Sequence, residues 1–252
     1  MTTPAGDPAD PALPPPLLPL EGDVDDVGRV LAVVAHPDDL EYGAASAVAR
    51  WTAQGKEVSY VLVTAGEAGI DAIPPERCGP LRMEEERAGA RLVGVETVEF
   101  LGFSDGLVEA GIPLRRAIAD AVRRHRPEVV VTLNHHSMWP GAWNHADHRA
   151  TGIAVLDSVR DAANRWMFTD LAADPWNGVR FVLVCGSPYV SHYVDVGATI
   201  ELGVASLRAH RAYLDGLGPD APDPDTMLRG FARSSPETTG CEYSATFELV
   251  HA

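Results

Sequence analysis

The sequence predicts an α/β fold, a Rossmann-like three-layer α/β/α sandwich with a mainly parallel sheet. Short apolar segments of strand length alternate along the chain with stretches of helical periodicity. Strands separated by helices of about 10–15 residues form right-handed β-α-β crossovers with helices on both faces of one sheet. The first segment, V-G-R-V-L-A-V-V-A over residues 27–35, is almost continuously apolar. That pattern is typical of a parallel strand covered on both faces.

The later elements continue the same alternation. Strands are predicted over residues 57–64, 97–101, 128–133, 181–185 and 192–196, and helices over about 42–54, 81–93, 113–125, 149–166 and 200–216. Gly and Pro cluster in residues 216–224 and 234–240. We therefore expect residues 217–252 to be loop-rich, with one strand over 243–249.

The 252 residues suggest one catalytic domain over residues 27–252, preceded by a disordered, Pro-rich acidic tail over residues 1–26. Residues 1–20 hold seven of the 20 prolines and no aromatic residue. Such a composition buries too little apolar surface to offset the entropy of ordering. The alternative is that Leu17, Leu18 and Leu20 pack as a short extended clip over the core or over a partner subunit.

The composition excludes several classes of protein. No segment approaches the roughly 18 apolar residues of a membrane span, and the N-terminus lacks the pattern of a signal peptide. Cys78, Cys185 and Cys241 are far apart and odd in number, which fits a cytoplasmic protein better than a disulfide framework. The net charge of −16 disfavours nucleic acid and anionic membranes as partners. The sequence leaves a homo-oligomer open.

Charged side chains follow the first predicted strand directly, in the sequence His36-Pro37-Asp38-Asp39-Leu40-Glu41. Ligands of doubly wound α/β folds bind at this carboxyl end of the strands. A dinucleotide-binding protein carries G-x-G-x-x-G here, and three carboxylates would repel a pyrophosphate. The structural alternative is a solvated acidic turn in which Asp38 or Asp39 caps the next helix.

A second polar cluster, Asn144-His145-Ala146-Asp147-His148, lies between a predicted strand and the helix over 149–166. Two imidazoles and one carboxylate with an open position form the usual hydrolytic zinc site, and His36, Asp39 and His148 can supply that set. Because Asp38 and Asp39 are adjacent on a turn, their side chains diverge. One can then bind metal while the other faces the water, whose pKa zinc lowers to near ~7.

Together the two clusters resemble the PIG-L/LmbE-like family of metal-dependent de-N-acetylases, which includes the GlcNAc-phosphatidylinositol and mycothiol-pathway deacetylases. The resemblance covers about residues 28–215. Its most specific part is A-H-P-D-D followed by H-x-D-H; further matches are T-A-G-E-A-G (64–69), R-M-E-E (82–85), F-L-G-F-S-D-G (100–106) and L-R-A-H-R (207–211).

The resemblance implies a role for each matched position. It implies metal ligation by His36, Asp39 and His148, and proton abstraction from water by Asp38. It implies that His145 protonates or stabilises the oxyanion or the leaving amine and that Asp147 orients a histidine by a hydrogen bond. Arg82 and Asp105 would lie on the substrate side. Trp143 replaces a Tyr that some members use, so any stabilisation from that hydroxyl must come from elsewhere.

The function expected from the resemblance is zinc-dependent hydrolysis of the N-acetyl or short N-acyl group of an amino-sugar glycoside, which releases acetate and a free amine. Fe²⁺ or another divalent metal would also suit these ligands. The partner expected is a small acetamido-sugar substrate. Two alternatives are hydrolysis of another amide, such as a thiol conjugate, and a non-catalytic sugar-binding module. The intact motif residues disfavour the module. The roles of His135, His136 and His192 stay open.

Overall fold

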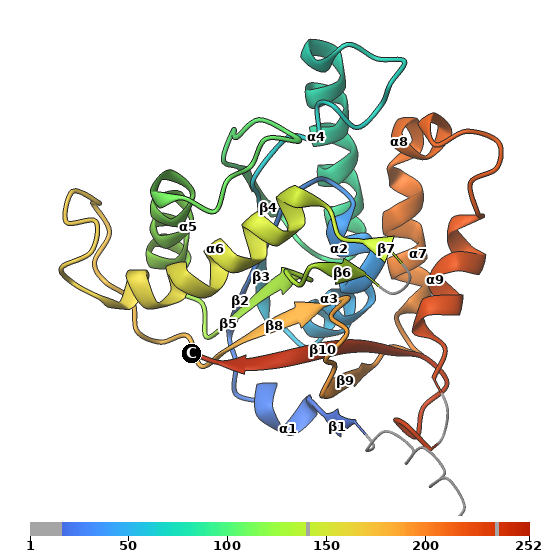
Figure 1. The fold of residues 1–252 in the computed structure, drawn as a ribbon. Helices are drawn as coiled ribbons and strands as arrows, with labels where there is room; N and C mark the ends of the chain where they lie inside the picture. Colours follow the sequence, from blue (N-terminus) through green and yellow to red (C-terminus); the bar gives the residue numbers. More distant parts are fainter. Residues whose placement is uncertain (1–16, 140–141, 235–236) are drawn as a thin grey trace, which may run out of the picture.

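A computed structural model describes residues 17–139, 142–234 and 237–252. It contains an eight-stranded sheet with helices on both faces (Figure 1). The order across the sheet is β1 (Leu18–Pro19), β9 (His192–Asp195), β10 (Ser244–His251), β8 (Phe181–Cys185), β5 (Val129–Leu133), β2 (Arg29–Val34), β3 (Glu57–Leu62) and β4 (Thr97–Phe100). Only β10 runs antiparallel to its neighbours within the described part of this sheet. The predicted α/β sandwich with a mainly parallel sheet is confirmed.

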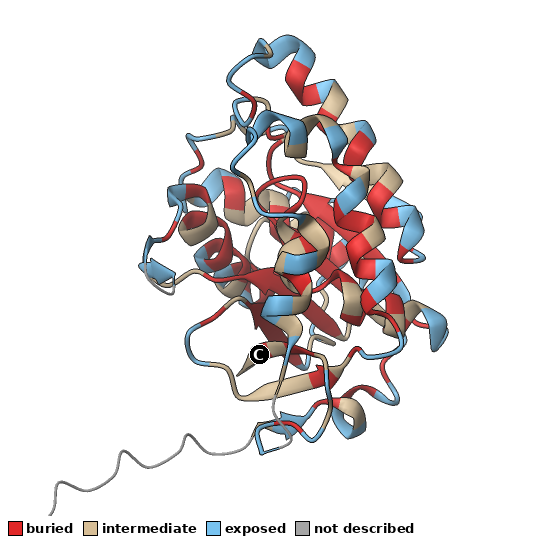
Figure 2. Ribbon diagram, turned by 90° about the vertical axis from the view of Figure 1, so that its right-hand side faces the viewer, coloured by how far each residue is buried: buried red, intermediate tan, exposed pale blue. Residues whose placement is uncertain are grey.

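The alternation of side chains along β2 divides the core into two layers. Val30, Ala32 and Val34 belong to one apolar cluster, while Leu31 and Val33 belong to the other. This is the two-residue period of a strand that is buried on both faces. Figure 2 shows the result, with buried strands enclosed by helices whose outer faces are exposed.

Helices from both halves of the chain cover the two faces. The first layer is covered by α2 (Asp39–Gly43), α3 (Ala45–Ala53), α4 (Pro75–Leu92) and α7 (Ile200–Ala209), followed by α8 (Arg211–Gly216) and α9 (Pro224–Ala232). The second layer is covered by α5 (Ile112–His125) and α6 (Ala146–Ala163). A short hairpin, β6 (Met138–Trp139) and β7 (Ala142–Trp143), leads from β5 to α6. No helix in the described ranges is long and apolar enough to cross a membrane.

Most predicted elements lie within a few residues of the observed ones, and three elements differ. The helix α4 begins at Pro75, six residues before the expected start, and tolerates Pro80 inside it. The predicted helix over 200–216 is two helices, α7 and α8, divided at His210. The helix α9 lies within the segment expected to be loop-rich.

The expectation of a disordered tail is wrong for residues 17–26. The strand β1 pairs in parallel with β9, and the helix α1 (Glu21–Val24) follows it. Leu20 is fully buried and Val24 is 5% exposed, so both belong to the core of the first layer. The average composition of the segment concealed these few apolar anchors, which are enough to dock it. Residues 1–16 lie outside the described residues.

We predict that Leu20→Ala lowers the free energy of unfolding by about 2 kcal/mol, at the lower end for a buried leucine because this edge of the domain can relax. Leu18→Ala is the matched control, since Leu18 is 59% exposed and its truncation should change stability by less than about 0.5 kcal/mol. Equilibrium urea unfolding of both variants measures the difference. Equal stability of the two variants would show that residues 17–26 do not dock in solution.

Candidate functional site

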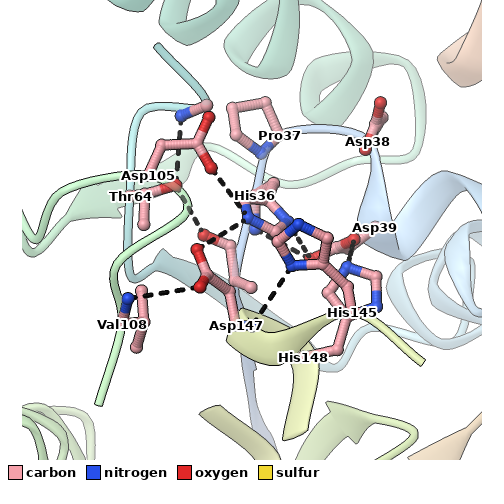
Figure 3. Close-up of polar contacts among 12 residues, drawn as sticks. His36, Pro37, Asp38, Asp39, Thr64, Asp105, Val108, His145, Asp147 and His148 are labelled. Atoms are coloured by element: carbon pink, nitrogen blue, oxygen red, sulfur yellow. Dashed lines mark hydrogen bonds and ion pairs between the residues drawn. The ribbon is translucent and has the colours of Figure 1, made fainter. Parts of the chain in front are cut away.

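Parallel pairing of β2 with β5 brings the two polar clusters to one edge of the sheet. His36 to Asp39 follow β2, and His145 to His148 follow the hairpin that comes after β5. Figure 3 shows their side chains converging from these two segments. Residues more than 100 positions apart in the sequence are therefore neighbours because parallel strands end at the same edge.

The side chains of His36, Asp39 and His148 form the centre of this cluster. One ligand atom from each lies within 4.8 Å of the others. Asp39 Oδ1 is 3.1 Å from His148 Nε2, and Asp39 Oδ2 is 3.6 Å from His36 Nδ1. The Asp39 side chain is only 7% exposed. The structure therefore brings together the three predicted ligands.

Asn144 determines which nitrogen of His148 carries hydrogen. Its Nδ2 donates to the carbonyls of Asn134 (2.7 Å) and His136 (2.9 Å), which leaves Oδ1 as an acceptor 3.2 Å from His148 Nδ1. His148 Nδ1 must therefore donate, and in a neutral ring Nε2 carries the lone pair. That lone pair faces an Asp39 oxygen. Two acceptors at this distance require a proton or a cation between them.

The same reasoning applies to His36. Its Nε2 lies 3.0 Å from Asp105 Oδ1 and 3.3 Å from Asp147 Oδ2, so Nε2 carries the hydrogen and Nδ1 faces Asp39. Burial opposes charge on this ring, but hydrogen bonds to Asp105, Asp147 and Asp39 raise the pKa of His36 to about 12. A metal-binding histidine usually donates its second N–H to a carboxylate in this way. The donor set thus fits a divalent cation.

Asp147 and Asp105 are themselves fixed by backbone groups. Asp147 is fully buried and accepts hydrogen bonds from the N–H groups of Gly106 (2.7 Å) and Val108 (3.2 Å). Asp105 accepts one from the N–H of Ala68 (2.8 Å). Although burial raises the pKa of both carboxyls, contact with His36 and these N–H groups lowers it overall. Both carboxylates therefore hold the His36 ring from behind, although Asp105 was expected on the substrate side.

Asp38 points to the other side of the turn from Asp39 (Figure 3). Its φ of 90° lies in the left-handed region, which is strained for a residue with a side chain. Its backbone N–H donates to Glu86 Oε2 at 3.0 Å, and its carboxylate accepts from Arg82 Nη2 at 3.0 Å. Burial raises the pKa of Asp38 to about 7, against the opposing effect of Arg82. The predicted divergence of the two aspartates is observed.

The capping alternative does not describe this turn. Asp38 is the N-cap residue of α2, but its side chain makes no capping hydrogen bond. The Asp39 carboxylate instead accepts from the backbone N–H of His36 at 2.8 Å. The acidic residues thus face buried cationic and imidazole partners and are not solvated caps.

Arg82 is 3% exposed, and its guanidinium donates to Asp38, to the Pro37 carbonyl and to the Gly66 carbonyl. Tyr213 covers it, with Cζ 4.4 Å from the ring centroid. Gly66 adopts φ +63°, and a Cβ there would lie 2.3 Å from Arg82 Nη1. Every side of the guanidinium is thus occupied by protein. The expected substrate contact of Arg82 stays a prediction, which this burial does not favour.

His145 is the N-cap residue of α6, where its Nδ1 accepts from the Asp147 N–H at 3.1 Å. In the neutral ring the hydrogen must then lie on Nε2. Burial and the neighbouring His36 and His148 lower the pKa of His145. His145 is also exposed, so its Nε2–H is a neutral hydrogen-bond donor that a ligand can reach.

A fully buried cluster lies behind Asp38. His210 Nε2 is 3.6 Å from Glu41 Oε1 and 3.7 Å from Glu86 Oε2, and Ser206 donates to Glu41 at 2.8 Å. Burial and the nearby Glu41 raise the pKa of Glu86 well above its usual value. Despite burial, the neighbouring carboxyls of Glu41 and Glu86 raise the pKa of His210 to about 9.

Sequence reasoning placed Asn144 in the second polar cluster without giving it a role, and it did not assign Glu86 or Tyr213 to the site. Asn144 directly precedes the second motif, and its amide is the signal that identifies it as the partner of His148. Glu86 and Tyr213 had no local signal, because they reach Asp38 and Arg82 through tertiary packing.

The remaining candidates lie around the cluster. Trp143 is 67% exposed and stacks with Arg149, 5.1 Å from Cζ to the ring centroid. His136 contacts Glu248 at 2.9 Å, and His192 contacts Ser191 at 2.8 Å. Neither histidine belongs to a group of metal-ligating geometry among the described residues.

Comparison with known proteins supports the predicted family. Residues 31–159, just over half of the chain, match the PIG-L family, described as GlcNAc-PI de-N-acetylase. The chain is 28% identical over 199 residues to diacetylchitobiose deacetylase of Thermococcus kodakarensis, covering 74% of this chain and 70% of that protein. It is 27% identical over 234 residues to a 1D-myo-inositol 2-acetamido-2-deoxy-alpha-D-glucopyranoside deacetylase of Thermomonospora curvata, covering 77% and 71%.

A solved structure extends the similarity to nearly the whole chain. N,N'-diacetylchitobiose deacetylase from Pyrococcus horikoshii, complexed with its inhibitor MPG, superposes with a TM-score of 0.82 at 25% sequence identity. The superposition covers 92% of this chain and 87% of that one. The family match contains both polar clusters, so the residues that converge at the sheet edge lie inside the matched region. The chain therefore belongs to the PIG-L family of de-N-acetylases.

Proposed function

We propose that this protein is a metal-dependent N-deacetylase that hydrolyses the acetamide of an N-acetyl amino-sugar glycoside to acetate and a free amine. One observation carries the proposal. The lone pairs of His36 and His148 converge on the Asp39 carboxylate, in a chain whose relatives are named amino-sugar deacetylases. A binding module would have no need for this arrangement, because it buries a charge that requires a cation partner.

His36, Asp39 and His148 would hold the metal, and zinc suits two imidazoles and one carboxylate; Fe²⁺ is the alternative. When bound, the ion polarises the amide carbonyl and lowers the pKa of water. Asp105 and Asp147 keep the His36 ring in the tautomer that presents Nδ1. Asn144 accepts from His148 Nδ1 and so keeps the His148 ring in the tautomer that presents Nε2.

Proton transfer falls to Asp38 and His145. Asp38 is the carboxylate of the turn that does not face the two imidazoles, so it is the candidate to take the proton of the attacking water. The water oxygen adds to the acetamide carbon, the C–N bond breaks, and the amine leaves with a proton. His145 can donate its Nε2–H to the developing negative oxygen or to the amine, because its Nδ1 is occupied by the Asp147 N–H.

Arg82 takes a different role from the one expected at the sequence level. We assign it to positioning, since it fixes Asp38 and does not reach an open surface. The cellular setting proposed is the cytoplasm, because the three cysteines are far apart and odd in number. The net charge of −16 argues against nucleic-acid partners. We also propose that residues 27–252 form one catalytic domain to which residues 17–26 are docked, and that the chain forms a homo-oligomer. Cleavage of another amide, such as a thiol conjugate, stays the alternative.

The direct test is incubation of the purified protein with N-acetylglucosamine glycosides, including diacetylchitobiose. Stoichiometric release of acetate and of a free amine, followed by mass spectrometry, is the expected result. Binding of these sugars without any acetate release, with metal present, would favour the non-catalytic module.

We predict that Asp39→Ala and His148→Ala lose the bound metal, which the unchanged protein holds at about one ion per chain. His145→Ala is the control, because His145 belongs only to an alternative group with His36 and Asp147. It should keep the metal and lose activity. Elemental analysis of the purified variants measures the occupancy. Metal retained by Asp39→Ala but lost by His145→Ala would move the ion to the alternative group.

We predict that Asp38→Asn keeps the metal and lowers kcat by about 100-fold or more, the usual scale for a general base. The amide preserves the size of the side chain but cannot accept the proton. Metal content and steady-state kinetics, measured on one preparation, separate the two effects. Turnover equal to that of the unchanged protein would exclude Asp38 as the base.

We predict that Arg82→Lys lowers kcat about 10-fold or more with little change in KM, because one ammonium cannot replace the several directed contacts of the guanidinium. Arg87→Ala is the matched control on α4, where Arg87 pairs with the exposed Glu84. It should leave kinetics and thermal stability unchanged. A rise in KM at constant kcat in Arg82→Lys would instead indicate direct contact with the substrate.

A further inference from the structure

A cavity of about 590 Å³ opens directly beside the candidate metal ligands. Asp39 and His148 line it together with Leu228 and Phe231 of α9. Its volume lies within the range of small-molecule sites. An acetyl methyl group would fill only a small part of it, so the cavity can also take a larger part of the substrate.

Most of the surface that lines the cavity is apolar. Leu133, Val196, Ile200, Leu228 and Phe231 contribute to it. Trp139 adds an aromatic ring, packed so closely over Gly186 that a Cβ there would lie 2.6 Å from it. The acidic side chains of the lining are those of Asp39 and Glu41.

The polar side chain of Ser187 offers little to a polar ligand. Its hydroxyl donates to Glu248 at 2.5 Å and accepts from the N–H of Tyr189 at 3.0 Å. The described lining contains no Lys or Arg. The cavity therefore suits uncharged carbon groups better than a phosphate or a carboxylate.

About half of the cavity-lining residues, among them Leu228 and Phe231, belong to a part of the chain that the family match does not reach. Leu228 and Phe231 lie beyond residue 159, where the match ends. Leu228 is 5% exposed, but the Phe231 side chain is left 66% exposed. An exposed aromatic residue on a cavity wall is a candidate binding contact, because an apolar ligand would remove it from water.

We infer that the substrate carries an apolar alkyl or aryl group of several carbons, which this cavity binds while the scissile amide lies at His36, Asp39 and His148. The inference rests on the proposed deacetylase function. The apolar group has two chemical sources, the acyl chain that is removed or the aglycone that stays on the sugar. Both would be recognised by the same burial of apolar surface.

Two homologous series distinguish these sources. One varies the acyl group of a methyl glucosaminide from acetyl to butanoyl, hexanoyl and octanoyl. The other keeps the N-acetyl group and varies the glycosidic alkyl group from methyl to octyl. We expect kcat/KM to rise in one series by about fourfold per buried methylene. A flat or falling kcat/KM in both series overturns the inference and leaves the deacetylase function intact.

Calorimetric measurement of the affinity for the same compounds distinguishes a failure of the proposed deacetylase function from a failure of the cavity inference. If neither series is hydrolysed, the proposed function fails. The cavity inference is then decided by binding alone, and it is overturned unless affinity rises with chain length in one series.

Variants of α9 locate the effect. Phe231→Ala should lower kcat/KM for the preferred long-chain substrate by about 10-fold and leave the short-chain substrate within about twofold. Leu217→Ala is the matched control, an exposed apolar residue at 46% that does not line the cavity. Ala232→Phe, which adds bulk to the wall, should abolish the chain-length preference. Thermal unfolding verifies that each variant is folded. Equal effects of Phe231→Ala and Leu217→Ala would overturn the assignment to this cavity.

Discussion

The left-handed backbone at Asp38 is the constraint on which the candidate site depends. Two adjacent carboxylates directly after a buried strand would repel one another if they faced the same side. With φ at 90°, Asp39 turns toward the imidazoles of His36 and His148, and Asp38 turns toward Arg82. A strained non-glycine conformation costs on the order of 1–3 kcal/mol and persists only where the surroundings over-determine it. Here the bond from the Asp38 N–H to Glu86 supplies part of that compensation.

The ionisable side chains behind this turn are buried, so they interact with one another and not with solvent. Glu41, Glu86 and His210 are packed together without exposure, and burial together with the nearby Glu41 raises the pKa of Glu86 well above its usual value. The neighbouring carboxyls raise the pKa of His210 to about 9, so the imidazolium of His210 is stabilised as their partner in a buried pair. Removing one member of such a pair leaves the other charge buried and unpaired, which costs more than the pair contributes. The cluster thus stabilises one position of the Asp38 backbone, which matters more for the geometry of the site than for overall stability.

The fold and the convergence of His36, Asp39 and His148 were predictable because their signals are local. The apolar run before His36 and the run before the second motif indicate two parallel strands, whose carboxyl ends share one sheet edge, and the structure places these strands side by side. Asp38 and Asp39 had to diverge because they are adjacent. The roles of Arg82 and Asp105 were less predictable. Their side chains reach Asp38 and His36 from α4 and from the loop after β4, and packing between those elements leaves no periodic trace in the sequence. Docking of residues 17–26 was only the alternative to a disordered tail, since two buried residues, Leu20 and Val24, have little effect on an average composition.

The proposed catalytic residues and the wall of the adjacent cavity come from different parts of the chain. The residues proposed to hold a metal and to move protons follow strands whose positions are fixed by the parallel core, so their geometry tolerates little change. The wall of the adjacent cavity comes partly from α9 and partly from the start of β10, a strand of the sheet itself. Changes in α9 would alter the shape of the cavity without moving His36, Asp39 or His148. Under the proposed function, the C-terminal segment would therefore determine which substrates the site accepts, and the apolar side chains of Leu228 and Phe231 would favour an apolar group.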